Sequence, residues 1–503
     1  MKKILLSVVA IVFSFLLHAQ KADQKIADYL NNDDFFALKE VFPIIKDSVS
    51  PFLKDLTQSL LYCHFNRPKQ ACSSFQHFFT THQGKIESGL ATNLIYLWAE
   101  NLRILGFHKE ALQLIDGYLL NYAKEEQDKL KDYYRTISVY CEAYKNFPKS
   151  YIKQNTETVS SPLIFTQTGK RGQTMYIPVS INKKITNFIF DSGAGDNIVS
   201  EQFAEDNCIK VLNDSVQMIG AAIGYGKLGF ADSLKIGDLV YYNASFLVVP
   251  EITPGSKFND HAVLGLPFLR LQKEIQIYPQ KKQIIFSLKE SKEHESNLML
   301  KNNQLIADAL MNNKIVQMHF DTGSVKSSLN AYYYSKNKKL ITQNFKRDTI
   351  YIGGYGAEYI MPVYRIPTSS FKIGTQEFSM NNIEVFTKVG MTDQSYFSGV
   401  FGVDFIQKFE RISLNFNDMS LELYSGGEFL GFTNKTNFNL NTNSCYISNP
   451  YSIFNVPNNH SKEVNMSFKL GKKTLFRNVT YQFDPYKLKW EPIVQLQFIN
   501  LDK

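Results

Sequence analysis

The sequence is poor in cysteine and histidine, the side chains that most often form disulfides and zinc sites. Its 503 residues include only five Cys and nine His. Five cysteines are too few for a disulfide framework, and the odd number leaves at least one unpaired. The chain has no Cys-x-x-Cys pair and no His-Glu-x-x-His motif, two common signatures of redox and metal sites. We therefore expect neither a metal nor an organic cofactor.

Long runs of basic residues are also missing. The formal net charge is +8, but the lysines and arginines are dispersed along the chain. A nucleic-acid-binding protein usually shows a basic stripe or a recognisable module, and this sequence shows neither. We expect no nucleic-acid partner.

Long apolar runs are absent beyond the N-terminus. Residues 1–19 begin with two lysines after Met1, continue as an almost wholly apolar run from Ile4 to Leu17, and end in a small residue. This order is typical of a secretory signal peptide, and the run is short for a membrane anchor. The sequence predicts an exported protein, periplasmic or secreted, whose mature chain has no transmembrane segment. The Ala-Gln exit resembles signal peptides of Bacteroidetes and favours a Gram-negative bacterium.

The composition that is present favours a multidomain α + β protein. Hydrophobic residues make up 44% of the chain and aromatic residues 14%, which suits buried cores and β structure. Apolar residues recur at helical spacing over residues 20–150. A weak repeat relates Asn32–Ala37, Asn66–Ala71 and Gly106–Ala111, and it resembles tetratricopeptide repeats. An ordinary helical bundle is the alternative. Such repeats often form concave surfaces, so the helical region is a possible site for a protein partner.

The composition changes after the helical region. Residues 151–162 are polar and β-branched and are interpreted as a linker. Residues 163–290 and 295–425 then alternate short β-type runs with Gly, Asn and Asp, which predicts two all-β lobes. Residues 427–503 are rich in Asn and predict a small β extension.

The two predicted lobes are copies of one unit. Asn187–Ala194 is an apolar strand ending in Asp-Ser-Gly, and Val316–Ser324 is a similar strand ending in Asp-Thr-Gly. Downstream, Val263–Gly265 and Val400–Gly402 repeat an apolar-apolar-Gly element. One such Asp triplet is a common turn, but a pair in a duplicated segment could place two carboxylates side by side.

These motifs resemble the aspartic proteases, both retroviral and pepsin-like, over residues 160–425. The resemblance implies that Asp191 and Asp321 form a catalytic pair. Two adjacent carboxyl groups share one proton, so a general acid and a general base are present together. The resemblance also implies that the apolar-apolar-Gly element of each lobe supports the Asp loop in a psi-shaped arrangement. The neighbouring residues are expected to orient the pair: Ser192, Gly193, Thr322 and Gly323.

A further family feature is a hairpin flap that closes over the substrate. Gly220–Gly226 and Gly353–Gly356 are Gly-rich and follow the Asp loops at similar places. Tyr225 and Tyr355 are therefore candidates for substrate contact. A Gly-rich turn without function is the alternative, and the sequence leaves open whether one flap or two are used.

Three residues beside the Asp loops depart from the pattern. Asp196 and Lys326 are expected to face solvent. His319 is expected to be a structural histidine with its hydrogen bonds satisfied. The sequence as a whole predicts an exported aspartic endopeptidase acting on a peptide or protein substrate. Two alternatives remain: an inactive peptide-binding pseudoprotease, and a periplasmic scaffold acting through its helical repeats.

Overall fold

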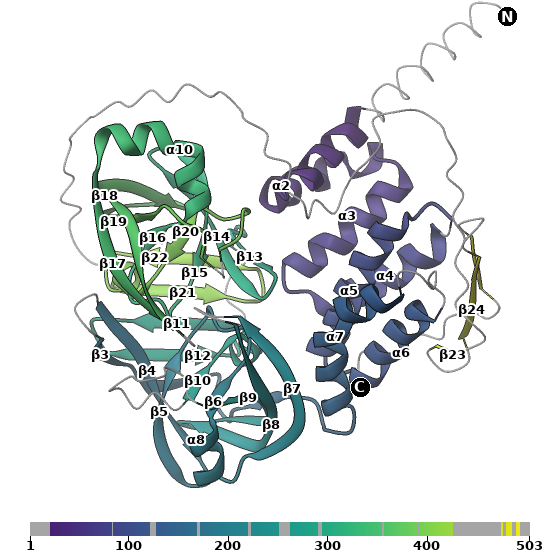
Figure 1. Ribbon diagram of the computed structural model, residues 1–503, viewed down its shortest axis with the longest axis horizontal. Coiled ribbons are helices and arrows are strands. Elements are labelled where there is room, and N and C mark those ends of the chain that lie inside the picture. The colour runs from purple at the N-terminus through teal and green to yellow at the C-terminus, as the bar shows by residue number, and fades with distance from the viewer. Residues whose placement is uncertain are drawn as a thin grey trace, which may run out of the picture.

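The computed structural model describes most of residues 21–425 (Figure 1). The described ranges are 21–82, 84–120, 127–168, 172–219, 223–250, 262–289, 294–354, 357–390 and 393–425, with three short strands between residues 474 and 492. The predicted signal peptide lies outside these residues. No helix within the described ranges is both long and apolar enough to cross a membrane.

The N-terminal part is helical, as predicted. After a helix over residues 21–31, its elements are α2 (Phe35–Ile45), η1 (Lys46–Ser48), α3 (Pro51–His64), α4 (Pro68–Thr81), α5 (Ser88–Ile104), α6 (His108–Leu119) and α7 (Gln127–Tyr144). From α3 to α7 each helix packs on the next. Ala71 and Ala111 are fully buried, because a small side chain lets neighbouring helices approach closely. The tetratricopeptide assignment itself stays a prediction.

The first lobe holds the first Asp loop. Its elements are β3 (Ile164–Thr168), β4 (Gly172–Ile181), β5 (Lys184–Phe190), β6 (Ile198–Ser200), α8 (Glu201–Asp206), β7 (Lys210–Ile219), β8 (Ile223–Ile236), β9 (Leu239–Val249), β10 (Ala262–Leu264), α9 (Leu266–Leu269), β11 (Glu274–Tyr278) and β12 (Gln283–Ser287). Strand β10 lies between β5, to which it is parallel, and β6, to which it is antiparallel.

The second lobe repeats this order, which confirms the predicted duplication. Its elements are β13 (Leu298–Lys301), β14 (Gln304–Met311), β15 (Lys314–Phe320), β16 (Ser328–Leu329), α10 (Ala331–Asn344), β17 (Lys346–Gly354), β18 (Ala357–Ile373), β19 (Gln376–Phe386), β20 (Gly399–Phe401), α11 (Val403–Ile406), β21 (Arg411–Asn415) and β22 (Ser420–Tyr424). Here β20 lies between β15 and β16 in the same way. The psi-shaped support predicted for both Asp loops is therefore present.

The segment predicted as a linker, residues 151–162, is mostly strand. It contains β1 (Tyr151–Lys153), which pairs with β9, and β2 (Thr158–Pro162), which pairs with β12. Strand β2 alternates exposed and buried residues, the pattern of a strand with one covered face. A sheet of order β2-β12-β11-β21-β22 joins the two lobes through the antiparallel pair β11 and β21. A polar, β-branched segment thus became a strand because an open sheet edge was available for pairing.

The C-terminal strands form a separate sheet. They are β23 (Thr474–Leu475), β24 (Val479–Asp484) and β25 (Lys489–Pro492), and they pair in that order. Among the described residues, the five-stranded sheet that joins the lobes has β2 as one edge strand and contains none of these three strands.

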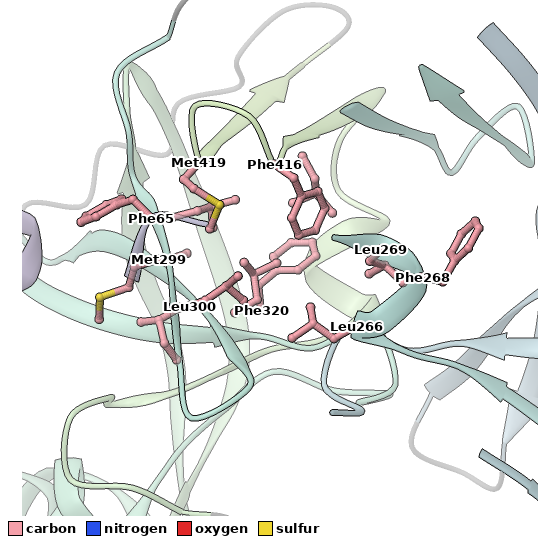
Figure 2. Close-up of a cluster of buried hydrophobic side chains, with 14 of the residues drawn as sticks. Phe65, Leu266, Phe268, Leu269, Met299, Leu300, Phe320, Phe416 and Met419 are labelled. Carbon is pink, nitrogen blue, oxygen red and sulfur yellow. The ribbon is translucent and has the colours of Figure 1, made fainter. Parts of the chain in front are cut away.

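One buried apolar cluster connects the helical region with both lobes. Figure 2 shows Phe65 from the end of α3, Leu266 and Phe268 from α9, and Phe320 and Met419 from the second lobe. All five side chains are at most 5% exposed. Burial of large apolar side chains is the main stabilising term in folding, so the helical region is packed as part of one body with the lobes.

Candidate active site

Each Asp loop begins where a buried strand ends. Asp191 follows β5 and Asp321 follows β15. The Asp191 amide donates to the Leu264 carbonyl at 3.0 Å, and the Asp321 amide donates to the Phe401 carbonyl at 3.0 Å. Both acceptors are the last residues of the central psi strands, so β10 and β20 fix the point at which each loop leaves its sheet.

The loop backbone holds each carboxylate. Oδ1 of Asp191 accepts from the amides of Gly193 (2.8 Å) and Ala194 (3.1 Å). In the second loop Oδ1 of Asp321 accepts from the amides two and three residues on, at 2.9 and 3.1 Å. Each side chain is therefore restrained in one orientation by its own turn.

Four hydrogen bonds cross between the two loops. The Ser192 amide donates to Oγ1 of Thr322 at 2.9 Å, and the Thr322 amide donates to Oγ of Ser192 at 3.0 Å. The Ser192 hydroxyl donates to the Phe320 carbonyl at 2.8 Å, and the Thr322 hydroxyl donates to the Phe190 carbonyl at 2.6 Å. Ser192 and Thr322 are fully buried. Every bond has a counterpart related by the duplication, so the two loops lock together around a pseudo-twofold axis.

The two carboxyl groups meet across this axis. They hydrogen-bond to each other. A Cβ atom added to Gly193 would lie 2.4 Å from Oδ1 of Asp321, and one added to Gly323 would lie 2.4 Å from Oδ1 of Asp191. No side chain fits at those distances, so glycine is required at both positions for the opposite carboxyl group to come close.

Both carboxyl groups hold protons more strongly than an ordinary Asp. Burial raises the pKa of Asp191, and the Asp321 charge and hydrogen bond raise it further. Burial also raises the pKa of Asp321. Two carboxyl groups in contact cannot both ionise at low cost, so the pair retains a shared proton.

Two polar side chains that the motif alone did not indicate support the loops. Oδ1 of Asn197 accepts from the Gly265 amide at 3.0 Å, and Oγ of Ser327 accepts from the Gly402 amide at 3.0 Å. Both Asn197 and Ser327 are buried. They occupy equivalent places in the two copies, so aligning the copies against each other would have revealed them.

Asp196 and Lys326 do not face solvent, contrary to expectation. Oδ2 of Asp196 accepts from the Tyr140 hydroxyl at 2.8 Å, and burial raises the pKa of this carboxyl. Lys326 forms an ion pair with Glu384 at 3.6 Å, and its side chain is 20% exposed. The error arose because the partner of each charge comes from a distant part of the chain.

His319 lies two residues before Asp321 and is buried. Its Nε2 has no hydrogen-bond partner among the described residues, so the expectation of a satisfied structural histidine is wrong for that atom. Burial lowers the pKa of His319 to about 4. The ring is therefore neutral at neutral pH, beside a pair of carboxyl groups that retains a proton.

The Gly-rich segment after each Asp loop belongs to a long antiparallel hairpin. In the first lobe β7 and β8 pair with Gln217 opposite Tyr225, and Tyr225 is 61% exposed. In the second lobe β17 and β18 pair up to Gly354. Tyr355 lies outside the described residues. Both Gly-rich segments are thus in antiparallel hairpins, and the use of either hairpin as a flap, with Tyr225 or Tyr355 as a contact, stays a prediction.

No group of three His, Cys, Asp or Glu in the described residues is arranged to hold a metal ion.

The first lobe also matches a known family. Residues 177–271 match the model of the gag-polyprotein putative aspartyl protease. This segment runs from β4 to the turn after α9 and includes the first Asp loop and its psi strand. Residues 177–271 are therefore similar in sequence to this family. The second lobe repeats the same order of elements, so the described chain has two β lobes of one topology.

Two solved structures are similar to this chain at low identity. The aspartic proteinase from Irpex lacteus is 12% identical, with 53% of this chain and 97% of that chain covered and a TM-score of 0.35. Basic 7S globulin from soybean is 12% identical, with 54% of this chain and 95% of that chain covered and a TM-score of 0.37. No curated protein matches the chain.

Proposed function

We propose that the protein is an aspartic endopeptidase in which Asp191 and Asp321 activate a water molecule. The observation that supports this most directly is the contact between the two carboxyl groups, whose pKa values are both raised. An aspartic protease needs one ionised and one protonated carboxyl group at the same place. A pair sharing a proton supplies both.

The proposed reaction follows from this shared proton. The ionised member takes a proton from water while the water oxygen attacks the peptide carbonyl carbon, and the protonated member donates to the carbonyl oxygen. The tetrahedral intermediate then loses the C–N bond, and the amine leaves with a proton from the pair. Positioned acid–base groups of this kind typically contribute about 10²–10⁴-fold to rate.

The substrate proposed is an extended peptide segment. Both hairpins present exposed apolar side chains: Ile223 and Tyr225 in the first lobe, and Tyr351 and Ile360 in the second. An extended segment pairs with a strand edge by main-chain hydrogen bonds, and alternate side chains enter pockets. Action outside the cytoplasm rests on the N-terminal signal peptide pattern, and it is part of this proposal.

Separate Asp191→Asn and Asp321→Asn variants test the proposal on an unfolded protein substrate. We expect each to lose at least about 10³-fold in cleavage rate, because an amide cannot accept the proton of water. Asp238→Asn is a matched control, since Asp238 is an exposed residue of the same lobe. If the unaltered protein and all three variants give equal, undetectable cleavage between about pH 3 and pH 8, the pair does no acid–base chemistry.

The same variants have a second readout, stability against pH. The folded pair has raised pKa values, so its favourable contribution is present at low pH and is lost as pH rises through those values. Near neutral pH both Asn variants should therefore unfold at a higher temperature than the unaltered protein. Near pH 4 the difference should shrink. Thermal unfolding followed by circular dichroism measures this even if cleavage is absent.

A further inference from the structure

A cavity of about 240 Å³ lies between the helical region and the first lobe. On the helical side it is lined by the end of α5, the start of α6 and the end of α7, and on the lobe side by residues of β8, β9 and the turn after α9. The charged and ring nitrogen-bearing side chains in its wall are Arg103, His108 and Arg270. None of the described lining residues is Asp or Glu.

Two nitrogen atoms of these side chains have no partner among the described residues. They are Nε of Arg270 and Nδ1 of His108, and both atoms are buried. A buried donor without an acceptor destabilises the fold, because its bond to water is lost and not replaced. An arginine Nε always carries a hydrogen, so the Arg270 atom in particular requires an acceptor.

The nearby carboxylates are already committed to other groups. Glu100 accepts from Nε and Nη2 of Arg103 at 2.7 and 2.6 Å. Asp196 accepts from the Tyr140 hydroxyl at 2.8 Å. Within the described ranges, Arg270 makes a single long hydrogen bond of 3.4 Å, from Nη2 to Asn303. The charges of Glu100 and Asp196 act on both Arg103 and Arg270, but Nε of Arg270 has no hydrogen-bond partner among the described residues.

The start of α6 adds positive potential to the same wall. This 12-residue helix begins at His108, and no side chain caps its N-terminus. Gly106 and His108 both line the cavity. The N-terminal end of a helix carries partial positive charge from its unpaired amides and favours anions.

We propose that this cavity binds a small oxyanion, a carboxylate or a phosphate group, with Arg270 as its main ligand. Arginine recognises either group through parallel N–H···O bonds. The anion would accept from Arg270 Nε and from the protonated tautomer of His108 Nδ1, and it would face the start of α6. Gly195, which follows the first Asp loop, lines the same cavity, so a bound anion would brace the loop that carries Asp191.

Calorimetric titration of the full chain with inorganic phosphate and, separately, with succinate tests the proposal. Sodium chloride at matched ionic strength is the control. We expect one site with a dissociation constant below about 5 mM for at least one anion, and a weakening of about tenfold or more in Arg270→Gln. Arg365→Gln, which changes a partly exposed arginine of β18, should bind as the unaltered protein does.

A second variant, His108→Phe, keeps a ring of similar size and removes the nitrogen. It should weaken binding and leave the circular dichroism spectrum unchanged, so it decides the question if Arg270→Gln fails to fold. Absence of binding at about 20 mM of either anion would overturn the proposal. Equal binding by both variants and the unaltered protein, or a response equal to that with chloride, would also overturn it. None of these readouts uses proteolysis, so their failure is distinct from failure of the proposed function.

Discussion

The two Asp loops are nearly identical at their centres and different at their edges. Each carboxylate is held by the same amides, and the loops exchange the same hydrogen bonds. At equivalent places just beyond, the first loop has Asp196 and the second has Lys326. Asp196 contacts Tyr140 of the helical region, whereas Lys326 pairs with Glu384 inside its own lobe. Symmetry is thus strict where the two carboxyl groups must meet and is lost where each lobe meets its surroundings.

The β7–β8 and β17–β18 hairpins also differ in which part of the chain packs against them. Tyr144 of α7 donates to the Gly229 carbonyl at 2.7 Å, and Phe147 packs on Phe230 with ring centroids 4.5 Å apart. The helical region therefore supports the first hairpin directly. The second hairpin is covered by α10 of its own lobe, where Tyr334 stacks on Tyr364 at 5.8 Å. The comparison indicates that the helical region is a structural part of the first lobe.

The equivalence of the two Asp loops is tested most strictly by replacing the glycine of either loop with alanine. Gly193→Ala and Gly323→Ala each place a Cβ 2.4 Å from the opposite carboxyl group. We expect each to cost about 3 kcal/mol or more in unfolding free energy and to abolish cleavage. Urea unfolding measures the first effect. Gly89→Ala, a helical position with open space, should be neutral or slightly stabilising, and unequal effects of the two loop variants would contradict strict symmetry.

The crossing hydroxyl groups should also behave as equals. Ser192→Ala and Thr322→Ala each remove a buried oxygen that accepts one hydrogen bond and donates another. We expect a loss of about 2–4 kcal/mol for each, because one buried amide and one buried carbonyl lose their partners. Thr322→Ser keeps the hydroxyl and should recover most of the loss. If the alanine variants lose little stability and Thr322→Ser is no more stable than Thr322→Ala, the crossing hydrogen bonds contribute little to the fold.

Substitutions beside Asp196 and at Lys326, at the edges of the two Asp loops, should change stability by unequal amounts. Tyr140→Phe removes the hydroxyl that donates to Asp196 and leaves a buried carboxylate without that donor, so we expect a loss of about 1–2 kcal/mol. Lys326→Gln breaks a longer ion pair of 3.6 Å and should cost about 1 kcal/mol or less. Chemical unfolding compares the two variants. A larger loss of stability from Lys326→Gln than from Tyr140→Phe would contradict the idea that the first loop is tied more tightly to its surroundings.

A comparably small effect, which depends on pH, concerns the contact of the second lobe with the helical region. Burial, together with the charges of Asp34 and Glu40, raises the pKa of Asp308 to about 7. This folded-state value lies above that of an unfolded chain, so the contribution of Asp308 to stability is present at low pH and is lost as pH rises towards about 7. Asp308→Asn should raise stability by about 1 kcal/mol at pH 8 and by little at pH 4. An equal gain at both pH values would exclude titration as the cause.

The Asp loops, the psi elements and the duplication could be predicted from the sequence because each is local. An apolar strand, a carboxylate, a small hydroxyl residue and a glycine occupy consecutive positions, as in Phe190–Gly193. Their recurrence at a near-constant spacing shows that one unit is repeated. The hairpins are similarly local, since paired strands are joined by a short turn.

The fate of the linker and of the two edge charges could not be predicted in this way. Strand β2 forms because β12 offers an unpaired edge, and nothing near residues 158–162 in the sequence specifies that edge. Asp196 is partly shielded from solvent because Tyr140 and Arg103 approach it from helices more than 50 residues away in the sequence. Likewise, the sequence could not predict that Nε2 of His319 lacks a hydrogen-bond partner, because that depends on which side chains pack around the ring.

The sequence by itself determined the two copies of the loop, because their chemistry lies within runs of three or four residues. Only the tertiary structure decided that the two carboxyl groups touch, that the helical region contacts the edge of the first Asp loop through Asp196, and that a cavity with unused donors lies between the helical region and the first lobe. Those features depend on distances between segments far apart in the chain, and such distances are set by the packing of the whole core.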